Sequence, residues 1–202
     1  MATDVARSAA TRRAVPRRQP LSIGVVGMCI FIGSEVMLFA SFFTAYFFAR
    51  SNAPVWPPVF THGEQFELPK NITAVNTGIL VFSSFTVWWA EHCMKHGDRK
   101  GLVRGLAVTM MLGATFLIIQ INEYAHIGFS PQDGIFGTVF YCLTGLHGAH
   151  VFIGLNALFY TFNRARVGEF SPGHSGPLMA ASIYWHFVDI VWVFLFTVVY
   201  LI

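Results

Sequence analysis

The chain has 202 residues, of which 54% are hydrophobic and only 11% are charged, and its formal net charge at pH 7 is +3. Soluble domains carry roughly 25% charged residues, so this composition excludes disordered, collagen-like, coiled-coil and disulfide-stapled secreted proteins. What remains is an integral membrane protein, or a very apolar core within a larger assembly.

Five long apolar stretches follow a basic tail of 20 residues that holds five arginines and one acid. A bilayer core about 30 Å thick needs roughly 20 apolar residues per helix. Runs of this length in lipid are helices, because the backbone must satisfy its own hydrogen bonds. The sequence therefore predicts an all-α, polytopic membrane helix bundle with five transmembrane helices in one domain, residues 21–202. The predicted spans are approximately 21–49, 71–93, 102–124, 137–162 and 177–202.

Lysine and arginine are distributed unevenly between the two ends of these spans. With the N-terminus inside, the inner segments carry 11 of the 13 basic residues and the outer segments carry only Arg50 and Lys70. The positive-inside rule then places residues 1–20 in the cytoplasm as a basic tail. Because the number of spans is odd, the C-terminus is expected outside.

One acidic residue, Glu35, lies near the middle of the first predicted span. An ionisable side chain at the centre of a bilayer costs about 3 kcal/mol on insertion scales, so it marks an interior face or a function. Two interpretations stay open. Glu35 could be a proton-titrating or ligand-binding carboxyl group, or it could be a structural acid that joins two helices by a hydrogen bond.

Polar pairs three residues apart occur in the last two spans, and this spacing places each pair on one helix face. Histidines on facing helices could ligate a transmembrane haem, which is one interpretation. The interpretation we favour is an interhelical polar seam of hydrogen-bonded side chains, without a metal and without a catalytic residue in this chain. The residues assigned to this seam are His147, His150, His186, Asp189 and, near the outer end of the third span, Glu123.

Small residues in the fourth span, Gly145, Gly148 and Gly154, would allow helices to approach closely there. The sequence shows no glycine-rich phosphate loop, CxxC motif, nucleophile elbow or pair of carboxylates on one span. A five-helix bundle of this kind is expected to work beside a partner, and nothing in it indicates nucleic-acid binding.

Five sequence blocks carry a resemblance to a known family. They are Ser34-Glu35-Val36-Met37-Leu38-Phe39, Trp56-Pro57-Pro58, Gly97-Asp98-Arg99-Lys100, Thr144-Gly145-Leu146-His147-Gly148-Ala149-His150-Val151 and Tyr184-Trp185-His186-Phe187-Val188-Asp189-Ile190-Val191-Trp192. In these blocks, and over essentially everything after the basic tail, the chain resembles subunit III of the haem–copper oxidases, most of all the cytochrome c oxidase type.

The resemblance implies a non-redox accessory subunit of an aerobic, proton-translocating oxidoreductase. Such a subunit packs against subunit I, in a complex whose haems and copper belong to subunits I and II. It supports proton uptake and protects the catalytic subunit from inactivation during turnover. Glu35 matches the membrane-embedded, carbodiimide-reactive glutamate of the family, which does not make it a conduit for pumped protons. The expected location is the cell membrane of a bacterium, and membership of a respiratory supercomplex is possible.

The chain departs from the common seven-helix form of the family, because its predicted spans resemble the last five helices. Phospholipids in that form lie between the first two helices and the other five, and the resemblance extends the expectation of bound phospholipid to this chain. The alternatives are a quinol oxidase subunit III and, more distantly, a nitric-oxide-reductase accessory protein. From other classes, a standalone membrane transporter or haem protein remains an alternative.

Overall fold

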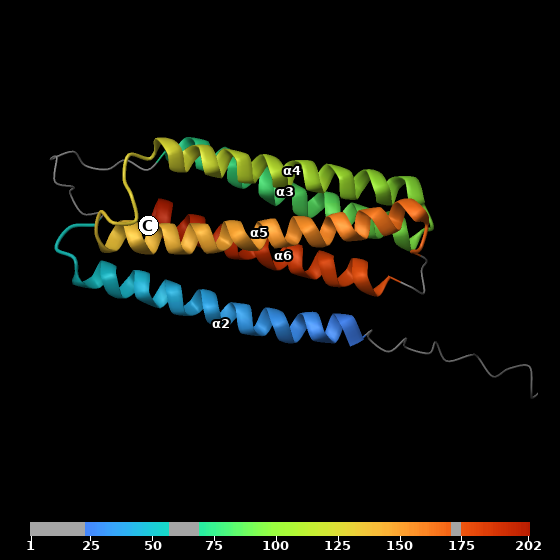
Figure 1. Cartoon of the computed structure of the whole chain (residues 1–202), viewed down its shortest axis with the longest axis horizontal. Helices are drawn as coiled ribbons and strands as arrows, with labels where there is room; N and C mark the ends of the chain where they lie inside the picture. The colour runs from blue at the N-terminus through green and yellow to red at the C-terminus, as the bar shows by residue number, and fades with distance from the viewer. Residues whose placement is uncertain (1–22, 57–68, 171–174) are drawn as a thin grey trace, which may run out of the picture.

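The computed structural model of this chain describes residues 23–56, 69–170 and 175–202. Within these ranges the chain forms long helices and no strand (Figure 1). Their bounds are Ile23–Asn52 (α2), Lys70–Lys95 (α3), Arg99–His126 (α4), Ile135–Val167 (α5) and Gly176–Phe196 (α6), and a π-helical turn, Thr197–Leu201 (η1), extends α6. Each of the five helices is long and apolar enough to cross a membrane, which confirms the predicted all-α, five-span bundle.

The helices extend beyond the predicted spans, most clearly where α5 continues to Val167. With 26 to 33 residues in each span, at a rise of about 1.5 Å per residue, they are about 40–50 Å long. This exceeds a hydrocarbon core of about 30 Å, so polar helix ends project into the interfacial region. The basic tail (1–20) and the Pro57-Pro58 step lie outside the described residues.

Four helices form a closed ring, and α2 lies against one side of it. Helix α3 packs on α4, α4 on α5, α5 on α6, and α6 back on α3, while α2 contacts α5 and α6. Figure 1 shows α2 along one edge of the molecule and the α3–α4 pair along the other, with α5 and α6 between them. Helix α6 is therefore the central element, with α2 and α3 on different sides of it.

The tight turn between α3 and α4 is specified by local sequence. Gly97 has a φ of 75°, a left-handed conformation that glycine adopts without steric cost. The Asp98 side chain then accepts a hydrogen bond from the Gly101 backbone N–H at 3.0 Å, which caps the first turn of α4. Arg99 donates from Nε to the carbonyl oxygen of Ala165 at 3.1 Å, so this turn is fastened to the end of α5.

The centre of the ring is filled by Trp185 of α6, which is completely buried. Its indole lies against two glycines, Gly113 of α4 and Gly154 of α5, where an added Cβ would come within 2.5 and 2.9 Å of ring atoms. Its Nε1 donates to Ser83 Oγ of α3 at 2.9 Å. One side chain thus contacts three neighbouring helices, and two of these contacts require glycine.

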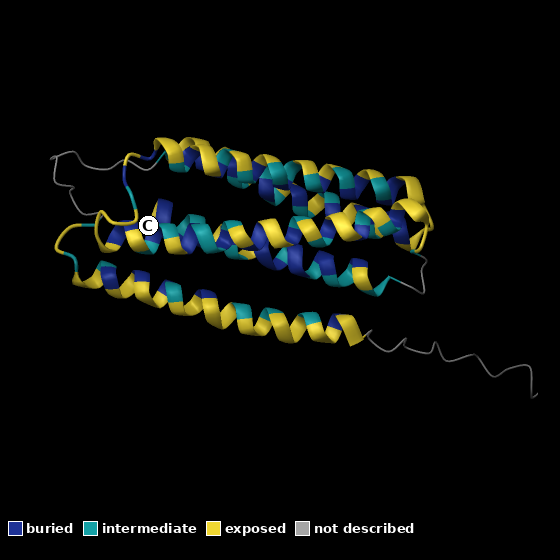
Figure 2. Cartoon of the chain, viewed as in Figure 1, coloured by how far each residue is buried: buried dark blue, intermediate teal, exposed yellow. Residues whose placement is uncertain are grey.

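The outer faces of the helices, drawn in yellow in Figure 2, carry many exposed apolar side chains, unlike those of a soluble bundle. Exposed isoleucine and valine side chains occur on each of the helices α2 to α6, and exposed phenylalanine on all of them but α4; lipid tails would cover these side chains. Only 11% of the apolar stretch of α2 is buried inside the protein, against 61% for the stretch that includes α6. Helix α2 is therefore peripheral, and α6 is held by its neighbours along most of its length.

Candidate functional site

Glu35 of α2 is paired with His150 of α5 near the middle of the membrane-spanning region. Glu35 Oε2 lies 2.8 Å from His150 Nε2, and the two side chains are only 14% and 8% exposed. The other ring nitrogen, Nδ1, lies 2.8 Å from the carbonyl oxygen of Leu146. A carbonyl oxygen can only accept, so the geometry assigns a hydrogen to Nδ1.

This arrangement leaves one proton to be shared between the carboxyl group and the imidazole. If the proton is on Glu35, the acid donates to a neutral Nε2, and if it is on the ring, Nε2 donates to the carboxylate. Both forms are neutral overall, which suits a site in low dielectric. The Tyr184 hydroxyl donates to the His150 carbonyl at 3.2 Å, and the Phe39 ring lies 5.0 Å from the imidazole. The pair joins α2 to α5 and can also hold a proton.

His147 is one turn from His150 but has different surroundings. It is fully buried between Trp192, at 4.7 Å between ring centroids, and Phe116, at 5.8 Å. Neither ring nitrogen meets a hydrogen-bond partner among residues 23–56, 69–170 and 175–202. His147 and His150 therefore do not act as a pair, although they share a helix and lie three residues apart.

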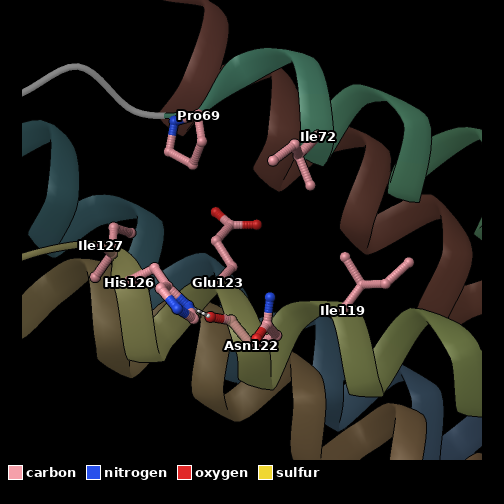
Figure 3. Close-up of a pocket in the computed structure, with 7 residues that line it drawn as sticks. All are labelled: Pro69, Ile72, Ile119, Asn122, Glu123, His126 and Ile127. Carbon is pink, nitrogen blue, oxygen red and sulfur yellow. Dashed lines mark hydrogen bonds between the residues drawn. The ribbon is translucent and has the colours of Figure 1, made fainter.

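Glu123 of α4 lies at the end of the bundle where α3 begins. Its Oε2 accepts from the Thr73 hydroxyl at 3.1 Å and its Oε1 accepts from the Tyr200 hydroxyl at 2.9 Å. The residue lines a cavity of about 280 Å³ with Pro69, Ile72, Ile119, Asn122, His126 and Ile127. Figure 3 shows its carboxyl group pointing toward the space between Pro69 and Ile72. These contacts fasten α4 to α3 and to the last turn of the described chain.

His186 and Asp189 of α6 meet a residue of α3, Ser84. The Ser84 hydroxyl lies 3.1 Å from His186 Nδ1 and donates to Asp189 Oδ2. The hydroxyl has one hydrogen, so the imidazole donates to it from Nδ1 while it donates to the carboxyl group. The second carboxyl oxygen, Asp189 Oδ1, is buried and accepts no hydrogen bond from the part of the chain that the structure describes.

Hydrogen bonds thus divide the predicted seam into separate contacts. His150 binds Glu35, Glu123 binds Thr73 and Tyr200, and His186 and Asp189 bind Ser84. No group of three or more histidine, cysteine, aspartate or glutamate side chains is arranged to hold a metal ion among the described residues. The partners Ser84, Thr73 and Tyr200 were not singled out from the sequence, because neutral hydroxyls are common in membrane helices.

Comparisons with known proteins extend these observations. The family model for cytochrome c oxidase subunit III matches residues 9–202. The chain is 40% identical over 180 residues to cytochrome c oxidase subunit 3 of Papio hamadryas, a match that covers 86% of this chain and 67% of the relative. It is 41% identical over 187 residues to cytochrome c oxidase subunit 3 of Anopheles gambiae, covering 90% and 70%. The matched region contains all five blocks quoted above.

Proposed function

The chain belongs to the cytochrome c oxidase subunit III family, and from this premise we propose that it is a non-redox accessory subunit of an aerobic respiratory oxidase. The observation that carries the proposal is the family match over residues 9–202, together with a five-span bundle of the expected kind. The subunit supports proton uptake by the catalytic subunit and its stability while oxygen is reduced. The named relatives are subunits of cytochrome c oxidases, which favours cytochrome c over quinol as the electron donor of the complex.

The proposed partners are oxidase subunit I as the main contact, subunit II, and membrane lipids. The haems and copper of the complex belong to subunits I and II. The two histidines of α5 have other uses, since His150 binds Glu35 and His147 packs between aromatic rings. This supports a scaffold whose effect on catalysis passes through contact with the catalytic subunit.

We further propose that the protein lies in the cell membrane of a bacterium, with residues 1–20 as a cytoplasmic tail before a single domain, 21–202. The α3–α4 turn and the end of α5 lie at one end of the bundle (Figure 1). Basic residues of the described chain are concentrated there: Lys95, Arg99, Lys100, Arg104, Arg164 and Arg166. The positive-inside rule assigns this end to the cytoplasm.

The role proposed for Glu35 is that of a buried, protonatable acid rather than of a proton conduit. Its partner His150 can take or return one proton, and the pair is enclosed by Phe39 and Tyr184. A protonated carboxyl group in an apolar setting is the form that a hydrophobic carbodiimide attacks. The same pair joins α2 to α5, so both interpretations of Glu35 apply to one contact.

Affinity purification of the full chain in mild detergent, followed by mass spectrometry, tests the proposal directly. The expected result is recovery of oxidase subunits that carry haem and copper. Deleting the chain should leave the haem spectrum of the membranes intact, while oxygen consumption fades during turnover, most clearly at higher pH. Immediate loss of the haems on deletion, or a Soret band in the purified single chain, would contradict an accessory, non-redox role.

A further inference from the structure

A groove between α3 and α6 is a feature of the surface that the contacts described above leave unexplained. It has a volume of about 570 Å³, and apolar side chains form most of its lining. Polar groups also reach it near the middle of both helices, namely Ser84, His186 and Asp189. Lipid tails cannot hydrogen-bond, so ionisable side chains at this depth almost always face protein or a water-filled cavity.

The uncovered face of α6 has the spacing of a helix-packing surface. Residues Met179, Ile183, His186, Ile190, Val193 and Thr197 are all at least partly exposed, and they are separated by four, three, four, three and four residues. This alternation keeps one face of a helix turned toward a second helix that crosses at a shallow angle. The other neighbours of α6 are already in place, because α2, α3 and α5 cover the rest of its circumference.

The hydrogen-bonding state of the groove specifies the chemistry of what docks there. Because His186 donates from Nδ1 to Ser84, a neutral ring presents Nε2 as an acceptor. Asp189 has one oxygen bonded by Ser84 and a second that accepts no hydrogen bond from residues 23–56, 69–170 or 175–202. Because that second oxygen is buried, the acceptor that the groove presents is His186 Nε2, and a complementary surface would bring a donor to it at mid-membrane depth.

We propose that this groove is the docking surface for a transmembrane helix of the oxidase partner, one that carries a hydrogen-bond donor in its middle third. The inference rests on the proposed function, because it takes the occupant from the oxidase complex. A helix is the occupant of choice because only a helix presents an apolar face with its own backbone satisfied in lipid. Its ridge of side chains fills the groove, and its donor binds His186 Nε2.

Site-specific photocrosslinking in membranes that contain the whole complex tests the proposal. A benzophenone amino acid replaces Ile190, which is 69% exposed in the groove, and in a matched control it replaces Ile118 of α4, which is 67% exposed away from it. The expected result is a crosslink from position 190 to a larger oxidase subunit and none from position 118. Adducts from position 190 to lipid only, or to a second copy of this chain, would overturn the proposal.

Substitutions that change side-chain size at position 190 and polarity at position 189 are then tested separately for their effect on retention of the partner. Ile190→Trp should reduce retention of the partner in mild detergent by about tenfold, because the docking helix is overpacked, while Ile118→Trp leaves retention unchanged. Asp189→Asn keeps an oxygen that accepts from Ser84, so Ser84 still accepts from His186 Nδ1 and Nε2 stays an acceptor. This variant should retain the partner better than Asp189→Val. Equal retention by Ile190→Trp and Ile118→Trp would refute the docking surface.

The same preparations separate the two levels of inference. If no oxidase subunit is recovered with the unmodified chain, the proposed function fails. If the oxidase is recovered but position 190 gives no crosslink to it, the function stands and only the assignment of this face is wrong.

Discussion

Replacing Gly113 by alanine should destabilise the bundle, because the new methyl group would meet the edge of Trp185. The alanine Cβ would lie 2.5 Å from Trp185 Cη2 and 3.0 Å from Leu155 Cδ2. The indole has little room to move, since Gly154 lies against it and its Nε1 is bonded to Ser83 at 2.9 Å. Overpacking a core costs about 1–3 kcal/mol and a lost hydrogen bond about 1 kcal/mol. Alanine also gains about 1 kcal/mol over glycine in helix propensity, so we expect a net loss of about 1–3 kcal/mol.

Thermal unfolding of the purified full chain in detergent, followed by circular dichroism at 222 nm, measures this effect. For a chain of this size 1 kcal/mol corresponds to about 2–4 °C in Tm, so Gly113→Ala should melt about 2–12 °C lower. The matched control is Gly145→Ala in α5, where no atom lies within 4 Å of the added Cβ. Alanine is also the better helix former by about 1 kcal/mol, so this control should melt at or slightly above the wild-type temperature.

A double variant tests whether contact with Trp185 causes the loss of stability. Trp185→Phe shortens the ring at the point of contact, so Gly113→Ala should cost much less in that background than in the wild type. An unchanged Tm for Gly113→Ala would refute the assigned packing. So would an equal loss with and without the indole, because the strain would then arise elsewhere.

Other contacts give predictions of the same kind. Glu35→Gln should leave the oxidase assembled and consuming oxygen, because the amide can donate to His150 Nε2. The same change should abolish labelling by a hydrophobic carbodiimide. Persistent labelling would place the reactive acid elsewhere. Asp98→Ala should cost about 1 kcal/mol by removing the cap of α4, and Asp98→Ser should restore the melting temperature. Tyr200→Phe should cost about 1–3 kcal/mol of stability, because it leaves a buried oxygen of Glu123 without its hydrogen bond. An unchanged melting temperature would show that this bond does not form.

The sequence was sufficient to predict the five helices, but not to predict which helix each polar side chain contacts. Apolar runs of more than 20 residues predicted all five spans, because lipid imposes one backbone solution. That Glu35 joins two helices by a hydrogen bond was one of the two interpretations that its position in an apolar run allowed. Its partner did not, because helical periodicity states which residues share a face and not which neighbour that face meets. Glu35 and His150 are 115 residues apart in the chain.

The glycines also show what the sequence does not predict, namely which of them lies close to a neighbouring helix. Gly145, Gly148 and Gly154 look alike in the sequence, but only Gly154 lies close to a neighbouring side chain at less than 3 Å from an added Cβ. Gly145 has no atom within 4 Å of that position, so the expectation of a close approach there is wrong. The glycine in closest contact with the indole is Gly113, on a different span. Which glycine is needed depends on where Trp185 lies, and that is a property of the packed ring.

The polar contacts explain how so apolar a chain adopts one arrangement of helices. In lipid, burying apolar side chains between helices gains little over leaving them in contact with lipid tails, so packing and polar contacts must set the register. Each polar contact here joins a different set of elements: Glu35–His150 joins α2 to α5, Ser84–Asp189 joins α3 to α6, and Glu123 joins α4 to α3 and η1. Sliding any of these helices by one turn would leave a buried carboxyl group unpaired. The contact at Ser84–Asp189 also reaches the groove between α3 and α6, so residues that set the register of these two helices lie where a docking helix would pack.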